Sequence, residues 1–253
     1  MISQRLIVCL DVEGGKVVKG VQFVSLKEMG DPPALAARYE EQGADEIVLL
    51  NIAADSEDRR KMIDTVRRTA DRLFIPLTVG GGIGSADEVG GMLRAGADKV
   101  SINSAAVRRP AVITDAAERF GVQCVVASID SRREGSTWRV YVRGGREATG
   151  LDVIEWAREC ARLGAGEILL TSIDRDGTRQ GYDLELTRAV ADAVSIPVVA
   201  SGGGGESAHV VDVLKFGKAD AALMAGALHD GSTSVSEIKA AMLAANMHVR
   251  TAA

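Results

Sequence analysis

The sequence repeats itself, and this repeat limits the possible folds more than any other feature. Segment 43–51, GADEIVLLN, resembles segment 164–172, GAGEILLTS, and segment 75–82, IPLTVGGG, resembles segment 196–204, IPVVASGGG. Both pairs are offset by 121 residues (164 minus 43, and 196 minus 75). The match of ADKVSIN, from residue 97, to ADAALMA, from residue 219, is collinear with them. Such a repeat predicts a molecule built from two similar halves.

Short apolar runs rich in β-branched residues alternate with amphipathic, helix-like segments along the chain. Strands buried on both faces and separated by helices indicate a parallel sheet. Eight such units in 253 residues predict a (β/α)8 TIM barrel forming a single domain over 1–253, with half-barrels of about 1–120 and 121–253. An open, doubly wound sheet fits the alternation but accounts less naturally for the repeat. The expected strands are 5–11, 46–52, 76–79, 99–103, 124–130, 167–173, 197–201 and 221–225.

Composition argues against several classes of partner. The formal net charge is −5 and no basic block is present, so nucleic-acid binding is not expected. The apolar runs are far shorter than the ~20 residues of a membrane span, and the N-terminus carries no secretory pattern. Three cysteines, Cys9, Cys124 and Cys160, favour a reducing, cytoplasmic location over a disulfide framework.

Two aspartates occupy equivalent places in the repeat. Asp11 is expected to end the first apolar strand, and Asp130 is expected to end the fifth. The active sites of such barrels lie at the carboxyl ends of the strands, and strands one and five face each other across the barrel. Each aspartate alone could simply cap a turn. Together they predict an acid–base pair on opposite sides of a substrate.

Glycine-rich segments predict two phosphate sites. Gly81 and Gly82 follow the third strand, and Ser201, Gly202 and Gly203 follow the seventh; each group leads into a helix. Glycine allows backbone N–H groups to approach a ligand, and helix N-termini favour anions. The first group is expected beside Asn103 and Ser104, and the second beside Met224, Ala225 and Gly226. Plain turns are the alternative. The duplication instead favours an elongated ligand with a phosphate at each end.

Two further loops belong to the same end of the barrel. Segment 171–183 places Asp174, Asp176 and Gly177 after the sixth strand. Its spacing matches no metal site, so hydroxyl binding or turn formation is expected, with no metal and no cofactor. Segment 13–23 predicts a long loop that carries Lys16 and Lys19. This loop is either a lid whose lysine reaches a phosphate or an ordinary solvated loop.

Charged residues open four of the strands at the other end of the barrel. Two are basic and two are acidic, so a closed ring of ion pairs is possible there, although ordinary solvated strand ends are the simpler reading. The four residues are Arg5, Glu46, Lys99 and Glu167.

Six motifs taken together resemble the cyclase subunit of imidazole glycerol phosphate synthase, a family of histidine biosynthesis. They are CLDVEGGKVVKG, TVGGGI, DKVSIN, TSIDRDGT, GYD and ASGGG, and the resemblance spans about residues 3–250. A sister family, phosphoribosylformimino-carboxamide ribotide isomerase, shares the repeat and the two aspartates but usually lacks DKVSINSAAV and LLTSIDRDGT. A third possibility is a non-catalytic phosphate-binding subunit.

The resemblance implies a reaction and a partner. The bisphosphate N'-phosphoribulosylformimino aminoimidazole carboxamide ribotide would react with ammonia, giving imidazole glycerol phosphate and aminoimidazole carboxamide ribotide. Asp11 and Asp130 would be the acid–base pair. The four charged strand starts would form a gate for ammonia from a glutaminase subunit docked at the N-terminal face, near Tyr39, Asp98 and Gln123. The chain itself offers no cysteine site suited to glutamine hydrolysis.

The resemblance also implies a substrate-binding set. One phosphate would bind at Gly82, Asn103 and Ser104, and the other at Gly177, Gly203, Ala225 and Gly226. The full set is Lys19, Asn51, Gly81, Gly82, Ser101, Asn103, Ser104, Thr171, Asp176, Gly177, Ser201, Gly202, Gly203, Ala225 and Gly226.

Several positions depart from the family's pattern. Aspartate is usual where Asn51 stands, and asparagine cannot titrate. Serine is usual at Gly226, where a hydroxyl contact would be lost, and an aromatic residue usually adjoins the histidine near His229. Threonine is more common at Ser104, whose hydroxyl is retained.

Overall fold

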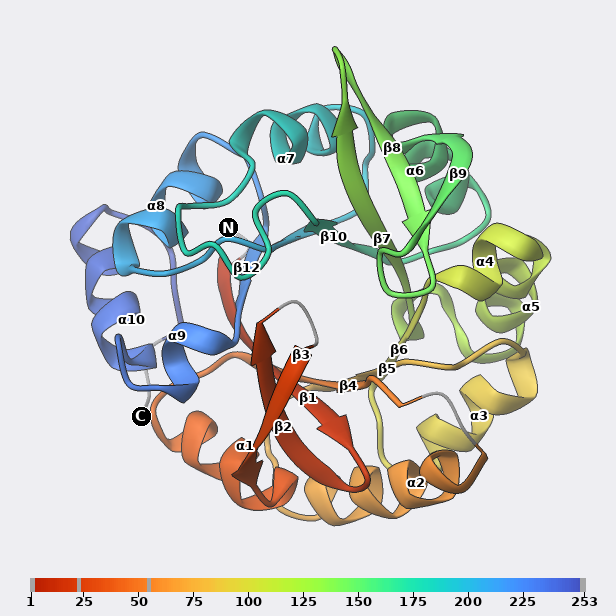
Figure 1. Ribbon diagram of the computed structural model, residues 1–253, viewed down its shortest axis with the longest axis horizontal. Helices are drawn as coiled ribbons and strands as arrows, with labels where there is room; N and C mark the ends of the chain where they lie inside the picture. The colour runs from red at the N-terminus through yellow and green to blue at the C-terminus, as the bar shows by residue number, and fades with distance from the viewer. Residues whose placement is uncertain (1–2, 22–23, 54–55, 251–253) are drawn as a thin grey trace.

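Eight parallel strands close into a barrel in the computed structural model (Figure 1). The structure describes residues 3–21, 24–53 and 56–250, without the side chains of 19–21, 24–27 and 56–59. Neighbours follow the order β1-β4-β5-β6-β7-β10-β11-β12, and β12 pairs with β1 to close the ring. The predicted (β/α)8 barrel and the places of its eight strands are therefore confirmed. The strands are β1 (Arg5–Glu13), β4 (Glu46–Asn51), β5 (Leu77–Gly80), β6 (Lys99–Ile102), β7 (Val125–Glu134), β10 (Glu167–Ser172), β11 (Val198–Ser201) and β12 (Ala221–Met224).

Helices surround the barrel, and their N-termini are capped by the residues that the chain supplies there. The side chains of Ser85, Asp152 and Asp183 accept backbone N–H groups of the first turn, and Ser234 forms a capping box with Glu237. The helices are α1 (Pro32–Glu41), α2 (Ser56–Ala70), α3 (Ala86–Arg94), α4 (Ser104–Arg108), α5 (Ala111–Phe120), α6 (Val153–Arg162), α7 (Leu184–Ala191), α8 (Ser207–Lys215), α9 (Gly226–His229) and α10 (Val235–Ala244), with a 3₁₀ turn, η1 (Val122–Cys124). Among the described residues no helix is long and apolar enough to span a bilayer.

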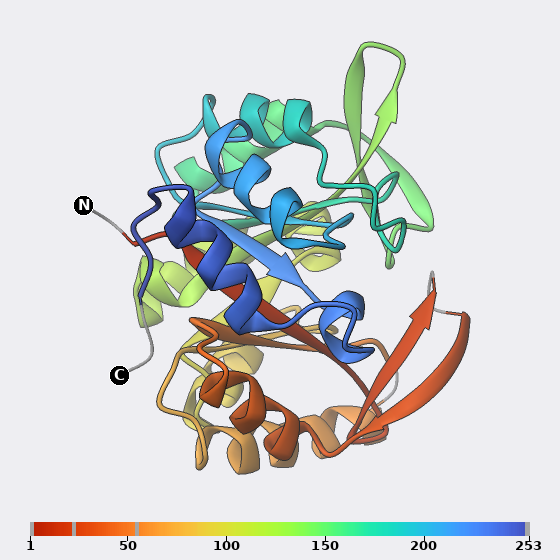
Figure 2. The same cartoon turned by 90° about the vertical axis from the view of Figure 1, so that its left-hand side faces the viewer.

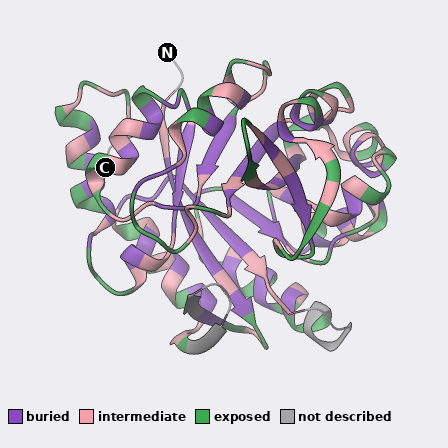
Figure 3. Cartoon of the chain, turned by 45° about the horizontal axis from the view of Figure 1, so that its top comes forward, coloured by how far each residue is buried: buried purple, intermediate pink, exposed green. Residues whose placement is uncertain are grey.

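The alternation of each strand separates two apolar layers. In β1, Leu6 and Leu10 belong to the large core between barrel and helices, whereas Ile7 and Cys9 belong to a small cluster inside the barrel. The strands are accordingly buried along most of their length (Figure 3). Because side chains alternate with a period of two, Asp11 shares the inward face with Cys9. The strand pattern thus aims a carboxylate into the barrel mouth.

Two antiparallel hairpins extend the barrel strands at one end of the molecule (Figure 2). Over residues 13–21 the expectation of a loop is wrong, and residues 22–23 lie outside the described part. β1 continues to Glu13, and β2 (Lys16–Val21) turns back along it and pairs with β3 (Val24–Gly30). At the second hairpin β7 runs to Glu134 and is followed by β8 (Thr137–Val142) and β9 (Glu147–Asp152). The predicted phosphate contact of Lys19 concerns a side chain that lies outside the described part.

Gly81 and Gly202 have a structural role that the repeat makes visible. Both adopt positive φ, +96° and +91°. An added Cβ at Gly81 would overlap the carbonyl oxygen of Asn51, and one at Gly202 would lie 2.6 Å from the carbonyl oxygen of Ser172. Each glycine therefore lets the chain pass over the end of a neighbouring strand.

We expect Gly81→Ala to lower the free energy of unfolding by at least about 2 kcal/mol, because positive φ and the backbone overlap both oppose a side chain. Urea unfolding measures the loss. Gly135→Ala is the matched control, since Gly135 has φ +63° but open space around a Cβ. An equal loss in both variants would show that only φ matters at Gly81.

Candidate active site

Asp11 and Asp130 both lie inside the mouth of the barrel, as their equivalent places in the repeat predicted. Asp11 is in register with Leu50 of β4, and Asp130 is in register with Thr171 of β10. Neither aspartate ends its strand, because the hairpins prolong β1 and β7 beyond them. The hairpins thus rise above the carboxylates and form part of the wall of the mouth.

Both carboxyl groups have pKa values above that of an ordinary aspartate. Burial raises the pKa of Asp11 to about 6, and burial likewise raises the pKa of Asp130 to about 6. The negative charge of Asp176 adds to both increases, whereas one hydrogen bond at each group opposes them. A carboxyl group with a pKa near 6 can give up or accept a proton close to neutral pH.

Each carboxylate has one side-chain donor. Asn103 donates from Nδ2 to Asp130 Oδ2 at 2.9 Å, and Cys9 donates from Sγ to Asp11 Oδ1 at 3.6 Å. The sequence had indicated Asn103 only as a phosphate ligand and Cys9 only as a small buried residue. The i, i+2 spacing of Cys9 and Asp11 was the available signal for the second contact.

Asp176 brings a third carboxylate to the mouth. It lies in the loop after β10, where its backbone N–H bonds the carbonyl of Ser172 at 2.9 Å. Burial raises its pKa, while the N–H of Gly177 opposes the increase. No group of three or more potential metal ligands occurs within 3–21, 24–53 and 56–250. Asp176 adds negative charge and a hydrogen-bond acceptor near Asp11 and Asp130.

The first predicted phosphate site gathers around the start of α4. Ser104 opens this helix, and Asn103 precedes it with φ −116° and ψ −97°. Gly82 is exposed, and an added Cβ there would meet open space. The Ser104 hydroxyl accepts the N–H of Arg143 from the β8–β9 turn at 2.9 Å. Its own proton is then available for donation to a ligand.

The second predicted site has the same construction at α9. Ala225 precedes the helix with φ −139° and ψ −85°, which resembles Asn103, and Gly226 opens it. Gly203 packs against the carbonyl oxygen of Gly181. The N–H of Gly181 in turn donates to the carbonyl oxygen of Gly203. The exposed Gly177 belongs to the loop that carries Asp176. The remaining predicted contacts, Ser101, Thr171 and Ser201, lie on β6, β10 and β11.

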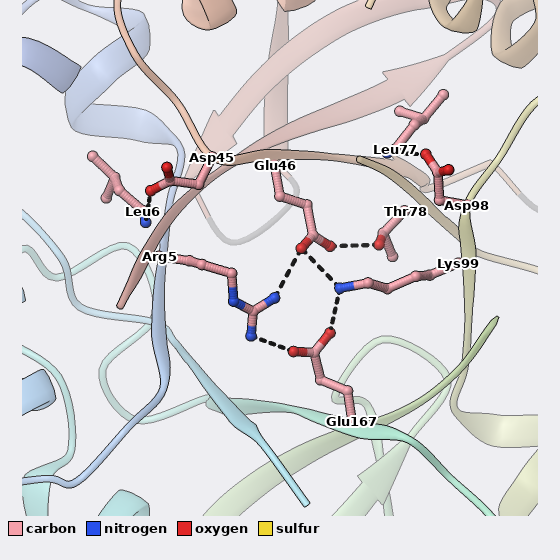
Figure 4. A network of polar contacts seen from close by, with 9 residues as sticks. All are labelled: Arg5, Leu6, Asp45, Glu46, Leu77, Thr78, Asp98, Lys99 and Glu167. Atoms are coloured by element: carbon pink, nitrogen blue, oxygen red, sulfur yellow. Dashed lines mark hydrogen bonds and ion pairs between the residues drawn. The ribbon is translucent and has the colours of Figure 1, made fainter. Parts of the chain in front are cut away.

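The four charged strand starts form a closed ring at the other end of the barrel (Figure 4). Glu46 accepts from Arg5 at 2.9 Å and from Lys99 at 2.8 Å. Glu167 accepts from Lys99 at 2.8 Å and also from Arg5. Burial alone would raise the pKa of Glu167, but the two cations hold it below its ordinary value. The simpler reading of solvated strand ends is therefore wrong.

A fifth member of the ring was missed from the sequence. The hydroxyl of Thr78, on β5, donates to Glu46 Oε1 at 2.6 Å (Figure 4). The sequence did contain an indication of this contact. Thr78 is the second residue of β5, whose start carries no charged residue, and its side chain faces the inside of the barrel. With Thr78, three donors from different strands bond the Glu46 carboxylate.

The three residues expected near the N-terminal face have different settings. Asp98, before β6, is exposed and accepts the N–H of Leu77 at 2.8 Å, and Gln123 is exposed in η1. Tyr39 is buried, and its hydroxyl shares a 2.8 Å hydrogen bond with His229, whose Nε2 lies 3.0 Å from the carbonyl oxygen of Cys9. The Tyr39 side chain thus packs within the protein rather than on its surface.

The chain matches known proteins over nearly its full length. The family model described as "Histidine biosynthesis protein" matches residues 5–234. A protein of Myxococcus xanthus (strain DK1622) named imidazole glycerol phosphate synthase subunit HisF is 61% identical over 251 residues, 99% of each chain. A protein of the same name from Trichormus variabilis (strain ATCC 29413 / PCC 7937) is 59% identical over 243 residues, 94% of this chain and 95% of the relative. With the barrel and its paired aspartates, these matches confirm the resemblance: the chain belongs to the histidine biosynthesis protein family, as an imidazole glycerol phosphate synthase subunit of the HisF type.

Proposed function

We propose that the chain cyclises and cleaves N'-phosphoribulosylformimino aminoimidazole carboxamide ribotide with ammonia, giving imidazole glycerol phosphate and aminoimidazole carboxamide ribotide. The observation that carries this proposal is the pair Asp11 and Asp130, each with a pKa of about 6, in one barrel mouth. Groups of this acidity suit proton removal on one side of a substrate and proton donation on the other near neutral pH.

The proposed substrate spans the mouth between the two glycine-rich sites. One phosphate accepts hydrogen bonds at Gly82, Asn103 and the Ser104 hydroxyl. The other is held at Gly177, Gly203 and the backbone of Ala225 and Gly226. The proposal is supported by the similar starts of α4 and α9, one in each half of the chain. The residues before them, Asn103 and Ala225, have similar backbone angles.

Asn51 retains the local structure that an aspartate would form. Its Oδ1 accepts the N–H of Ala53 at 3.0 Å, a bond that a carboxylate oxygen also makes. The proposed reaction therefore assigns proton transfer to Asp11 and Asp130, and Asn51 holds the turn after β4. A side-chain hydroxyl is absent at Gly226, so phosphate binding there relies on the backbone N–H.

The proposed partner is a glutaminase subunit docked at the N-terminal face, which supplies ammonia through the charged ring. Three exposed apolar side chains support this face as the docking surface. Phe74 is 97% exposed, Val122 53% and Phe216 53%, and each lies in a connection that enters a barrel strand at its N-terminal end. Aromatic and other large apolar side chains are enriched in protein interfaces, although single exposed ones also occur on ordinary surfaces.

Phe74→Glu is expected to weaken binding of the glutaminase subunit at least tenfold, because it replaces a fully exposed aromatic side chain of the proposed docking face with a charge. Titration calorimetry measures the affinity, and ammonium-driven turnover should stay unchanged. Gln180→Glu, an exposed position in the loop after β10, adds the same charge at the other end and should bind normally. Equal affinity of the Phe74→Glu variant and the unmodified chain would place the partner elsewhere.

The direct test is turnover of the bisphosphate, followed optically, with ammonium alone and then with glutamine and a glutaminase subunit. We expect ammonium-dependent product formation, and glutamine-dependent formation only with the partner present. The isomerase substrate is supplied in parallel, since the paired aspartates and the repeat also fit that reaction. Turnover of that substrate alone would replace the proposal, and binding of the bisphosphate without turnover would indicate a non-catalytic subunit.

A further inference from the structure

The two aspartates occupy equivalent places in the two halves, but their neighbours are not equivalent. Asn103 precedes α4 at the seam where β6 pairs with β7, the strand of Asp130. Its counterpart in the repeat is Ala225, which precedes α9 where β12 pairs with β1, the strand of Asp11. The two backbones have similar φ and ψ, so the geometry is conserved while the side chain differs. Ala225 has no polar side chain to donate.

The hydrogen bonds that remain differ in strength. An amide N–H at 2.9 Å from Asp130 is a strong donor to a carboxylate, and a bond to a charged acceptor is stronger than a neutral one. The Cys9 thiol at 3.6 Å from Asp11 is a weak donor. The amide orientation, with Nδ2 toward Asp130 Oδ2, fits an ionised carboxylate, since the opposite orientation would place Asn103 Oδ1 against it. Burial raises both pKa values to about 6, and within that shared range the stronger donor favours the anion of Asp130.

The surroundings add little that distinguishes the two groups. Among the described side chains, Asp176 of the β10–α7 loop is the charged group that acts on both, and its negative charge disfavours ionisation of each. Cys9 is the titratable neighbour of Asp11, and burial raises the pKa of its thiol. The Lys19 side chain, on β2, lies outside the described part. The difference between the two sites therefore rests on their hydrogen-bond donors.

We infer that Cys9 and Asn103 are positioning residues that make the two aspartates unequal: Asn103 holds Asp130 as the carboxylate, whereas Cys9 leaves Asp11 as the group that takes up a proton first. The inference rests on the proposed function for its catalytic meaning, because an acid–base pair needs one proton donor and one acceptor. In the free protein, Asp130 is then the carboxylate that can accept a proton, and Asp11 is the carboxylic acid that can donate one.

The test is a carboxyl ¹³C NMR titration of the full chain labelled at aspartate, without substrate. Asp11→Asn and Asp130→Asn identify the two resonances. We expect Asp130 to titrate at lower pH than Asp11, and Asn103→Ala to raise the Asp130 midpoint by about one pH unit while leaving Asp11 in place. Coincident midpoints in the unmodified chain, or an Asp130 midpoint that Asn103→Ala does not move, would overturn the inference.

Two further variants change the surroundings of Asp11, so the test does not depend on how well Asn103→Ala folds. Cys9→Ser introduces a stronger donor and should lower the Asp11 midpoint by about half a unit to one unit. Ala225→Asn gives Asp11 the amide that Asp130 has and should lower it similarly. An Asp11 midpoint unchanged in both would contradict the inference. Because no substrate is used, that failure leaves the proposed reaction standing, whereas absent turnover would remove the reaction and leave the titration valid.

Discussion

Asp11→Asn is expected to lower ammonium-driven turnover by about 10²–10⁴-fold, the range for loss of a general acid or base. Asparagine has nearly the same shape but cannot exchange a proton. Affinity for the bisphosphate should change little, because both proposed phosphate sites lie on other residues. Steady-state kinetics at saturating ammonium and equilibrium binding of the bisphosphate measure the two effects. Normal turnover in this variant would remove Asp11 from the acid–base pair.

The same substitution is expected to stabilise the folded chain at alkaline pH. The pKa of Asp11 is about 6 in the folded chain, raised from 3.8. The folded state therefore binds the proton more tightly than the unfolded state, and stability rises as the pH falls from above 6 toward 3.8. At pH 8 the ionised carboxylate lowers stability by up to about 3 kcal/mol, since one pKa unit corresponds to about 1.4 kcal/mol.

Urea unfolding at two pH values tests this linkage. Asp11→Asn should be more stable than the unmodified chain at pH 8, and the difference should shrink at pH 5, where folded Asp11 carries its proton. The pH 5 measurement is the internal control for changes in packing. A variant that is less stable at both pH values would show that hydrogen bonds of the carboxylate outweigh its burial.

Glu46→Gln is expected to lower the free energy of unfolding by about 3–5 kcal/mol, the cost of breaking a buried ion pair from one side. Glu46 is 2% exposed and is bonded by Arg5, Lys99 and Thr78. Glutamine offers one acceptor oxygen and no charge, so the two cations share Glu167 alone. Urea unfolding at constant pH measures the loss.

The matched control is Glu185→Gln. Glu185 pairs with Arg133 at 2.6 Å, but both side chains are largely exposed. Exposed pairs typically contribute about 0–1 kcal/mol, so this variant should stay close to the unmodified chain. Similar small losses in both variants would show that the ring at the N-terminal end contributes no more than a surface pair.

The barrel and its aspartates could be predicted because they depend on short-range patterns that occur twice. Eight apolar runs predicted eight strands, and the repeat placed Asp11 opposite Asp130. The first hairpin was missed although its signal is local. Gly14 and Gly15, both at positive φ, form a two-residue turn across which Glu13 pairs with Lys16, and a Gly-Gly turn of this kind is typical of a β-hairpin. The weak alternation of segment 16–21 hid the second strand.

The contacts within the site could not be predicted from the sequence either, for a different reason. Asn103 directly follows β6 and Asp130 lies on the neighbouring β7, and only the register of β6 against β7 brings the amide to the carboxylate. The ring has the same property, since Arg5 and Glu167 belong to different halves. Sequence indicated most of the polar groups that reach the barrel interior, Thr78 excepted, but not which of them bond.

The bond from Asn103 to Asp130 has a consequence for how such a chain is assembled from its halves. It crosses the boundary near residue 120, so a polypeptide of residues 121–253 alone would carry Asp130 without its donor. The ion pair between Arg5 and Glu167 crosses that boundary as well. Two separately synthesised halves would therefore each be incomplete, and co-expression would have to restore both contacts before turnover appeared. Duplication of an ancestral half would have yielded two identical pockets, so the present difference between Asn103 and Ala225 would have arisen after the halves were joined.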